Sequence, residues 1–273
     1  MTREGRTLVA TPLAESLAEP VRELLTDIEN VLALRNEFDP ATAEHTFSIV
    51  ANDYLTMTFL QPLIARLSVE APGIRLRIFP PTGDDFAERL RRHRADLLVM
   101  PQEALDERLE FHHSTLFHDR FVVAADKDHP DIGDEITLEQ FSTLPYLAAS
   151  SGNRRSLSEM QLDFLGVPPR NIEITAGFGM APFLLRGTRL ITLVHERLAL
   201  RVRDAAEIRL FEPPVPPRLQ PITEIMAWTN RTDAVPAHRW LRAALMGLAT
   251  EYDNSTPAAS TNATTDKGSH HQQ

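Results

Sequence analysis

The chain contains no cysteine among its 273 residues. This absence excludes a disulfide-stapled secreted scaffold, cysteine-ligated zinc sites, iron–sulfur clusters and thiol nucleophiles. Long hydrophobic runs are also missing, since no stretch approaches the roughly 20 apolar residues of a membrane helix. The first residues, MTREGRTLVATPL, lack the apolar core of a signal peptide. We therefore expect a cytoplasmic protein with no membrane partner.

Positive charge is scarce, because 28 Lys and Arg residues stand against 38 Asp and Glu residues and leave a net charge of −10. Nucleic-acid binding needs clustered Lys and Arg against the phosphates, so the body of this protein is a poor candidate for it. A short basic element on an acidic body could still bind DNA. The 42% hydrophobic and 24% charged residues are typical of a globular protein.

The common catalytic motifs are absent as well. The sequence has no GxSxG elbow, no Walker A phosphate loop and no GxGxxG fingerprint. The pairs His112-His113 and His270-His271 are poor metal sites, because neighbouring residues on a strand point to opposite faces. We expect no catalytic residues, no metal and no cofactor, although an enzyme with dispersed site residues stays open.

An amphipathic helix is predicted near the N-terminus. Thr11 is a suitable N-cap and Pro12 suits the first helical position. The apolar stripe is narrow and has no nearby partner in the sequence, which favours pairing with a second chain over packing on its own domain. Apolar residues recur at spacings of three and four at Leu13, Leu17, Val21, Leu24, Ile28 and Val31.

Strands and helices then alternate, which is typical of an α/β fold with crossover helices over a parallel sheet. A second block of strands and short helices follows, and a Pro-rich connector leads to the strand 222–229 and a last helix from Pro236. The tail, 252–273, is poor in apolar residues and is predicted to be disordered. The predicted strands are 46–53, 74–78, 96–100, 121–125, 146–149, 171–175, 189–194 and 207–212, and the clearest helices are 55–67, 86–90, 137–144 and 156–165.

Polar residues at the predicted strand ends indicate a ligand site. Ligands of open α/β sheets lie beyond the carboxyl ends of the strands, and helix N-termini with a nearby arginine would suit a small carboxylate or phenolate. Alternatively, Asn52, Asp53 and Ser151 are only helix caps. The segments expected to meet in one cleft are Asn52-Asp53-Tyr54, Pro101-Gln102, the loop from Ser150 to Arg154 or Arg155, and Gly177-Phe178-Gly179.

Several segments, taken in order, resemble LysR-type transcriptional regulators from about Arg3 to Leu248. REGRTLVATPLAESLAEPVRELL resembles the wing and linker helix, LQPLIARLSVEAPGIRLRI the start of the effector domain and RADLLVM its third strand. LFHDRFVVAADKDHP resembles the domain-crossing segment, and LLRGTRLITLVHERLAL and HRWLRAAL the late elements. FSIVANDYLTMTFLQPLIARL is most similar to the NodD and NahR branch, whose members sense aromatic or flavonoid-like inducers.

The resemblance implies two Rossmann-like lobes joined by two crossovers, as in type 2 periplasmic binding proteins. It implies a wing remnant at 1–11, a linker and dimerisation helix at 12–38, lobe I at 45–118 plus 222–250 and lobe II at 122–220. A small aromatic or carboxylate effector would bind between the lobes of a homodimer or tetramer and regulate transcription. The effector-binding residues expected are Asn52, Asp53, Thr56, Pro101, Gln102, Ser151, Arg154, Phe178 and Gly179.

The chain departs from the family at its start, because it begins inside the wing. Arg3 and Arg6 match the wing and are expected to contact DNA in an intact protein, but two arginines do not read a sequence alone. A late start codon, a truncated gene and a free-standing sensor without DNA binding are all consistent with this start. A solute-binding protein of a transporter is the rival with the same lobes, and it would need export.

Overall fold

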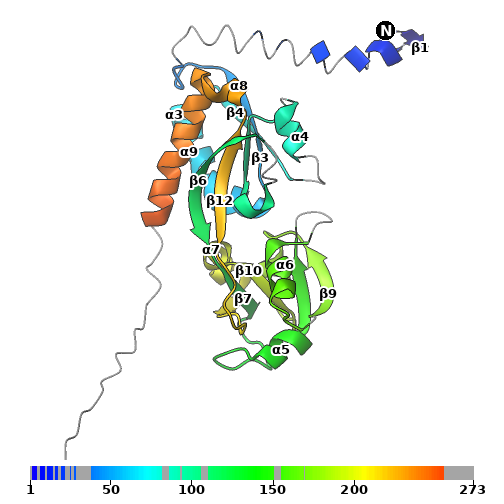
Figure 1. Ribbon diagram of the computed structural model, residues 1–273, viewed down its shortest axis with the longest axis vertical. Coiled ribbons are helices and arrows are strands. Elements are labelled where there is room, and N and C mark those ends of the chain that lie inside the picture. The colour runs from blue at the N-terminus through cyan, green and yellow to red at the C-terminus, as the bar shows by residue number, and fades with distance from the viewer. Residues whose placement is uncertain are drawn as a thin grey trace, which may run out of the picture.

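The computed structural model shows two lobes, one above the other in Figure 1. Each lobe contains a five-stranded sheet, and a two-stranded sheet lies at the N-terminus. Among the described residues, no helix is long and apolar enough to cross a membrane. The structure describes residues 38–81, 86–92, 94–105, 110–150, 155–168 and 170–254, together with 2–4, 7–9, 11–14, 16, 17, 20, 21, 25 and 28.

Lobe I contains the sheet β4-β3-β5-β12-β6. Its first three strands in this order are parallel, and β12 pairs antiparallel with both β5 and β6. The chain therefore leaves lobe I after β6 and returns to its sheet as β12. The strands are β3 (His45–Val50), β4 (Ile74–Phe79), β5 (Leu97–Pro101), β6 (His112–Asp119) and β12 (Ile222–Trp228).

Lobe II contains the sheet β11-β7-β10-β8-β9. The pairs β10–β8 and β8–β9 are parallel, whereas β7 pairs antiparallel with β10 and β11. Strands β4 and β9 are thus free edges of their sheets within the described chain. The strands are β7 (Phe121–Asp126), β8 (Pro145–Ala149), β9 (Asn171–Ala176), β10 (Ile191–His195) and β11 (Ile208–Phe211).

Local sequence signals set several helix ends. Thr137 and Gln140 form a reciprocal capping box at the start of α5, and Ser156 caps α6. Gly166 follows α6 at φ +68°, the left-handed conformation that glycine adopts without strain. The helical elements are α2 (Asp53–Leu55), η1 (Thr56–Leu60), α3 (Gln61–Glu70), α4 (Phe86–Arg91), η2 (Gln102–Ala104), α5 (Leu138–Thr143), α6 (Leu157–Phe164), η3 (Ala181–Leu184), α7 (Glu196–Ala206), α8 (Asn230–Asp233) and α9 (Pro236–Asn254).

One hydrophobic cluster continues from lobe I into lobe II. It contains Phe59 and Phe117 of lobe I together with Phe178, Leu198 and further residues of lobe II. Two smaller clusters fill the remaining face of each sheet. The lobes are therefore joined by buried apolar contact as well as by the chain.

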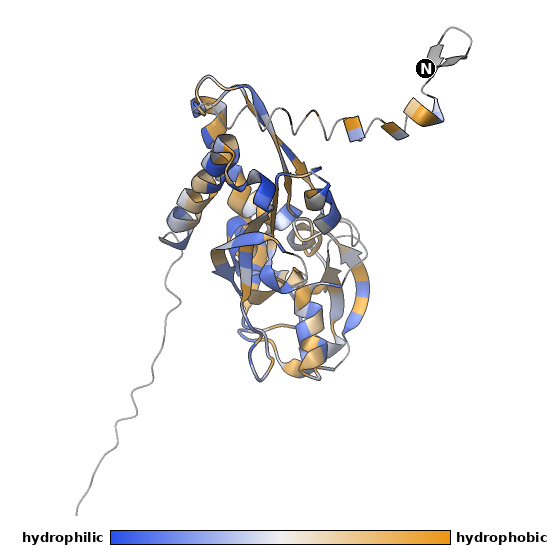
Figure 2. Cartoon of the chain, turned by 45° about the horizontal axis from the view of Figure 1, so that its top comes forward, coloured by the Kyte–Doolittle hydropathy of each residue, from blue (hydrophilic) through white to orange (hydrophobic). Residues whose placement is uncertain are grey.

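The N-terminal residues form a short hairpin of β1 (Thr2–Glu4) and β2 (Thr7–Val9), paired antiparallel. The described residues between 12 and 28 are helical, and they lie apart from the lobes in Figure 1. Figure 2 colours parts of these helical pieces orange, for hydrophobic residues. Five hydrophobic side chains here are exposed: Leu13, Leu17, Val21, Leu25 and Ile28.

The predicted α/β fold with two lobes is confirmed. The first alternating strands, β3, β4 and β5, are parallel as predicted, and each sheet also takes antiparallel strands from the segments that pass between the lobes. Strand β6 and the 11-residue helix α7 were not predicted at their full lengths. The predicted disorder of the tail concerns residues that, after 254, lie outside the described part of the chain.

Candidate functional site between the lobes

Both passages of the chain between the lobes lie close together. Strand β6 leads through Arg120 directly into β7, and β11 leads through residues 212–221 into β12. The Arg120 guanidinium donates to Glu196 at the start of α7 and to Glu212 in the second passage, at 2.7 and 2.6 Å. Arg120 thereby ties the two passages to each other and to lobe II.

The segment after β3 begins the lobe I side of the site. The Asn52 side-chain oxygen accepts the N–H of Leu55 at 2.8 Å, so Asn52 is the N-cap of α2. The Thr56 hydroxyl donates to the Asn52 carbonyl at 2.8 Å. Both side chains thus form hydrogen bonds within their own segment. For Asn52 this agrees with the alternative that the residue is a helix cap.

Asp53 reaches across to lobe II. One of its carboxylate oxygens accepts the N–H of Gly179 at 2.8 Å, and the other accepts the N–H of Tyr54 at 3.0 Å. A Cβ atom on Gly177 would lie 2.8 Å from the Asp53 carboxylate, and one on Gly179 would lie 2.7 Å from the sulfur of Met57. The two glycines therefore permit the close approach of lobe I to this loop of lobe II.

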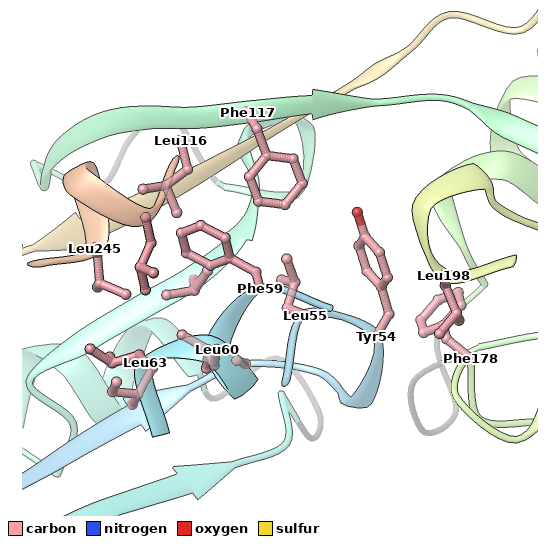
Figure 3. Packing of buried hydrophobic residues seen from close by; sticks show 14 of the residues in the cluster. Tyr54, Leu55, Phe59, Leu60, Leu63, Leu116, Phe117, Phe178, Leu198 and Leu245 are labelled. Carbon is pink, nitrogen blue, oxygen red and sulfur yellow. The ribbon is translucent and has the colours of Figure 1, made fainter. Parts of the chain in front are cut away.

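Tyr54 makes the second contact between the lobes. Its ring stacks on His195 of lobe II with the centroids 3.9 Å apart, and its hydroxyl donates to Asp119 at 2.6 Å. Phe178 meets the same imidazole edge-on at 5.2 Å. Figure 3 shows Tyr54 facing the side chains of Phe178 and Leu198 across the junction. We call Asp53, Tyr54, Asp119, Gly177–Gly179 and His195 the interlobe junction.

Burial sets the charges of the junction. It lowers the pKa of His195 to about 3, so the imidazole is neutral at physiological pH. Burial also raises the pKa of Asp119 to about 6, against hydrogen bonds from Tyr54 and from the backbone of Arg120 and Arg197 that favour the carboxylate. Asp119 is therefore mostly ionised at neutral pH.

Arg197 fastens lobe II to the end of the last helix. Its guanidinium donates to the Tyr252 carbonyl at 3.1 Å, lies 4.3 Å from the centroid of the Tyr252 ring, and pairs with Asp253 at 3.2 Å. Its backbone N–H points to Asp119 at 3.4 Å. Arg197 thus contacts α9 through its guanidinium and Asp119 of the junction through its backbone N–H.

A second buried acid, Glu224, lies beside the junction on β12. Its side chain is fully buried, and neither carboxyl oxygen has a hydrogen-bond partner among the described residues. Burial raises the pKa of Glu224, and the negative charges of Asp119 and Glu103 raise it further. The Glu224 carboxyl group therefore holds a proton more readily than an exposed glutamic acid does.

The remaining predicted residues divide into four groups. Phe178 is buried at the junction, whereas Pro101 and the exposed Gln102 lie at the same sheet edge as Asn52, because β5 runs parallel to β3. For Arg3 the structure describes only its place on β1. Ser151, Arg154 and Arg6 lie outside the described residues, so the structure does not place them.

Sequence reasoning missed Asp119, His195, Arg197 and Glu224. One signal was available for Glu224, because residues 222, 224, 226 and 228 share a face of a strand and Glu224 is the charged residue among three apolar ones. The described residues contain no cluster of three or more His, Asp or Glu side chains that could hold a metal ion. What the junction offers chemically is aromatic surface, backbone N–H groups and buried carboxyl groups.

Comparison with known proteins identifies the family. The LysR substrate binding domain matches residues 41–249. The chain belongs to the LysR family. It is 33% identical over 244 residues to Nodulation protein D 2 of Rhizobium tropici, covering 89% of this chain and 76% of that protein. It is 32% identical over 260 residues to Nodulation protein D 1 of a Bradyrhizobium species, covering 94% of this chain and 81% of that protein.

Solved structures agree with this assignment. A probable transcriptional regulator from Pseudomonas aeruginosa superposes with a TM-score of 0.76 at 26% identity, over 90% of this chain and 82% of that one. The regulatory domain of MexT, a transcriptional activator from the same organism, superposes with a TM-score of 0.63 at 24% identity. This match covers 76% of this chain and 100% of that one, and it supports the fold. The chain therefore carries the effector-sensing domain of a LysR-type transcriptional regulator, and the predicted resemblance to the NodD branch is confirmed.

Proposed function

We propose that this LysR-family chain binds a small aromatic or carboxylate-bearing effector at the interlobe junction. The observation that carries the proposal is the bond between Asp53 of lobe I and Gly179 of lobe II, because a ligand inserted there would change how the lobes meet. A shift in lobe orientation would then be the signal passed to DNA-bound parts of an intact regulator in the cytoplasm. Asn52, Thr56, Pro101, Gln102, Ser151 and Arg154 are the further contacts we propose.

A thermal-shift screen against hydroxybenzoates and flavonoids tests the proposal. A binding compound should raise the melting temperature of the wild type, and Phe178→Leu should abolish most of that rise. Phe183→Leu is the matched control, since Phe183 belongs to the same loop region but is exposed. If both variants keep the full shift, the effector binds elsewhere.

We also propose that the chain forms a homodimer or tetramer through the free edges of its sheets. On lobe II, α6 and β9 expose the apolar side chains Met160, Phe164, Ile172 and Ile174, and Phe164 is 90% exposed. On lobe I, a groove of about 350 Å³ lies between α3 and β4, lined by Ile64, Leu67, Ser68, Pro72, Ile74, Leu76 and Ile78. Two chains packed antiparallel would cover both surfaces, and the exposed stripe of the N-terminal helix would pair with its copy.

Sedimentation velocity tests the lobe contact. Phe164→Asp places a charge in the centre of the α6–β9 surface and should shift the protein toward smaller species at a given concentration. Met246→Asp is the control, because Met246 is also exposed and apolar but lies on α9. An unchanged distribution for Phe164→Asp would remove this surface from the assembly.

A further inference from the structure

One helix of lobe II, α7, is bound to two separate elements of lobe I. Arg197 and Arg201 are four residues apart on this helix, so both side chains lie on the same face. The Arg201 guanidinium donates to the side chain of Gln61, at the start of α3, at 3.0 Å. The Arg197 guanidinium donates to the Tyr252 carbonyl, near the end of α9, at 3.1 Å. This face of α7 therefore joins the lobes outside the interlobe junction.

The contact at Arg197 is the stronger of the two. The bond from Arg201 is exposed, so water competes with it. The Arg197 side chain is only 13% exposed, and its guanidinium lies 4.3 and 5.3 Å from the ring centroids of Tyr252 and Phe117. A cation that is shielded from water is held more strongly by aromatic rings. The pair with Asp253 adds little, because that carboxylate is exposed.

The end of α9 is itself fixed within lobe I. The Tyr252 ring packs edge-on against Phe117 of β6, with the centroids 4.7 Å apart. Glu251 pairs with Arg66 of α3 at 3.0 Å. Arg197 is thus the lobe II part of a contact whose other members all belong to lobe I. We call Arg197, Phe117, Tyr252 and Asp253 the α9 latch.

We propose that the α9 latch holds lobe II in its present position against lobe I, which makes the C-terminal end of α9 a second control point for lobe orientation. Lobe II cannot move away from α9 until the Arg197 guanidinium leaves the Tyr252 carbonyl and both rings. Binding of a partner to the last turn of α9, or unwinding of that turn, would release the latch without any effector. The inference rests on the proposed function only in taking lobe movement as the signal.

Single-molecule fluorescence transfer tests the latch without a ligand. The chain has no native cysteine, so dyes can be attached at Thr143→Cys on α5 and Ala243→Cys on α9, two exposed positions in different lobes. Arg197→Gln removes the guanidinium but keeps the backbone N–H that points to Asp119. The fraction of molecules outside the wild-type transfer peak should rise roughly ten- to a hundredfold, as expected for losing a hydrogen bond from a charged group.

Arg209→Gln is the matched control within lobe II. The Arg209 guanidinium also donates to backbone carbonyls, those of Gly133 and Ile132 at 3.2 and 2.9 Å, and it lies 5.2 Å from the centroid of the Phe211 ring. All these groups belong to lobe II, so Arg209→Gln should keep the wild-type distribution of transfer. If Arg209→Gln broadens this distribution as much as Arg197→Gln does, the proposal is overturned.

Tyr252→Leu tests the latch from the side of lobe I. It removes the ring beside Arg197 but keeps the carbonyl, so the distribution should broaden less than in Arg197→Gln. The double variant should broaden it no further than Arg197→Gln alone, because both residues act in one contact. A wild-type distribution in Arg197→Gln overturns the proposal, as do fully additive effects in the double variant. If Arg197→Gln does not fold, an unchanged distribution in Tyr252→Leu overturns it. None of these outcomes affects the effector screen, which depends on Phe178.

Discussion

The Tyr54 hydroxyl stabilises the end of lobe I beside the first passage between the lobes. Tyr54→Phe removes the donor 2.6 Å from Asp119 but keeps the ring that stacks on His195. A hydrogen bond to a charged group contributes about 1.5–3 kcal/mol net. The change should therefore lower the free energy of unfolding by about 1.5–3 kcal/mol at pH 7.5, where Asp119 is ionised.

The effect should depend on pH. The pKa of Asp119 is about 6, so most Asp119 carboxyl groups are protonated at pH 5. The hydrogen bond then joins two neutral groups and contributes about 1 kcal/mol. The loss in the free energy of unfolding caused by Tyr54→Phe should consequently be smaller at pH 5 than at pH 7.5, as measured by urea unfolding.

Tyr146→Phe is the matched control within lobe II. Tyr146 is also fully buried and donates to a buried carboxylate, Glu159, at 2.7 Å. Tyr146→Phe should lower the free energy of unfolding by a similar amount at pH 7.5. A loss below about 0.5 kcal/mol for Tyr54→Phe at pH 7.5 would refute the reasoning.

Three further stability changes follow from local contacts, each measured by urea unfolding. Gly73→Ala should lower the free energy of unfolding by about 1–3 kcal/mol, because the new Cβ would clash with the backbone oxygen of Ala43. Gly133→Ala is the control, since Gly133 has open space around it, and should change the free energy of unfolding by less than about 0.5 kcal/mol. Arg170→Met should lower it by about 3–5 kcal/mol, since the buried Glu159 carboxylate loses its cation; a loss under about 1 kcal/mol would contradict this. Glu224→Gln should stabilise the protein more at pH 8 than at pH 5. The raised pKa of Glu224 makes the wild type lose stability as the pH rises above the ordinary Glu pKa of about 4.3. Equal effects of the substitution at both pH values would count against this prediction.

Local patterns in the sequence were sufficient for most elements of the fold. The capping residue Thr137, the glycine at 166 and the proline at 236 each act within one turn of a helix, and the structure confirms all three helix ends. The apolar residues Ile74, Leu76 and Ile78, which alternate with Arg75 and Arg77, likewise indicate strand β4. These signals depend on neighbours in the chain, so the sequence contains them directly.

Contacts between distant parts of the chain follow a different rule. Asp53 and Gly179 are 126 residues apart in different lobes, and Tyr54 and Asp119 are 65 apart within lobe I. The predicted strand ends located Asp53 and Gly179 in the same region but gave no reason for a bond between them. Asp119, His195 and Glu224 acquire their shifted pKa values through burial in the folded protein, and no local pattern encodes that burial.

Apolar and acidic groups act in opposite directions in this part of the protein. The hydrophobic cluster shared by Phe59, Phe178 and Leu198 holds the lobes together at every pH, because burying apolar surface does not depend on protonation. Burying Glu224 beside Asp119 opposes folding, and does so more strongly as the pH rises. An apolar residue in place of Glu224 would remove this opposing contribution, so the stability of the protein would then depend less on pH.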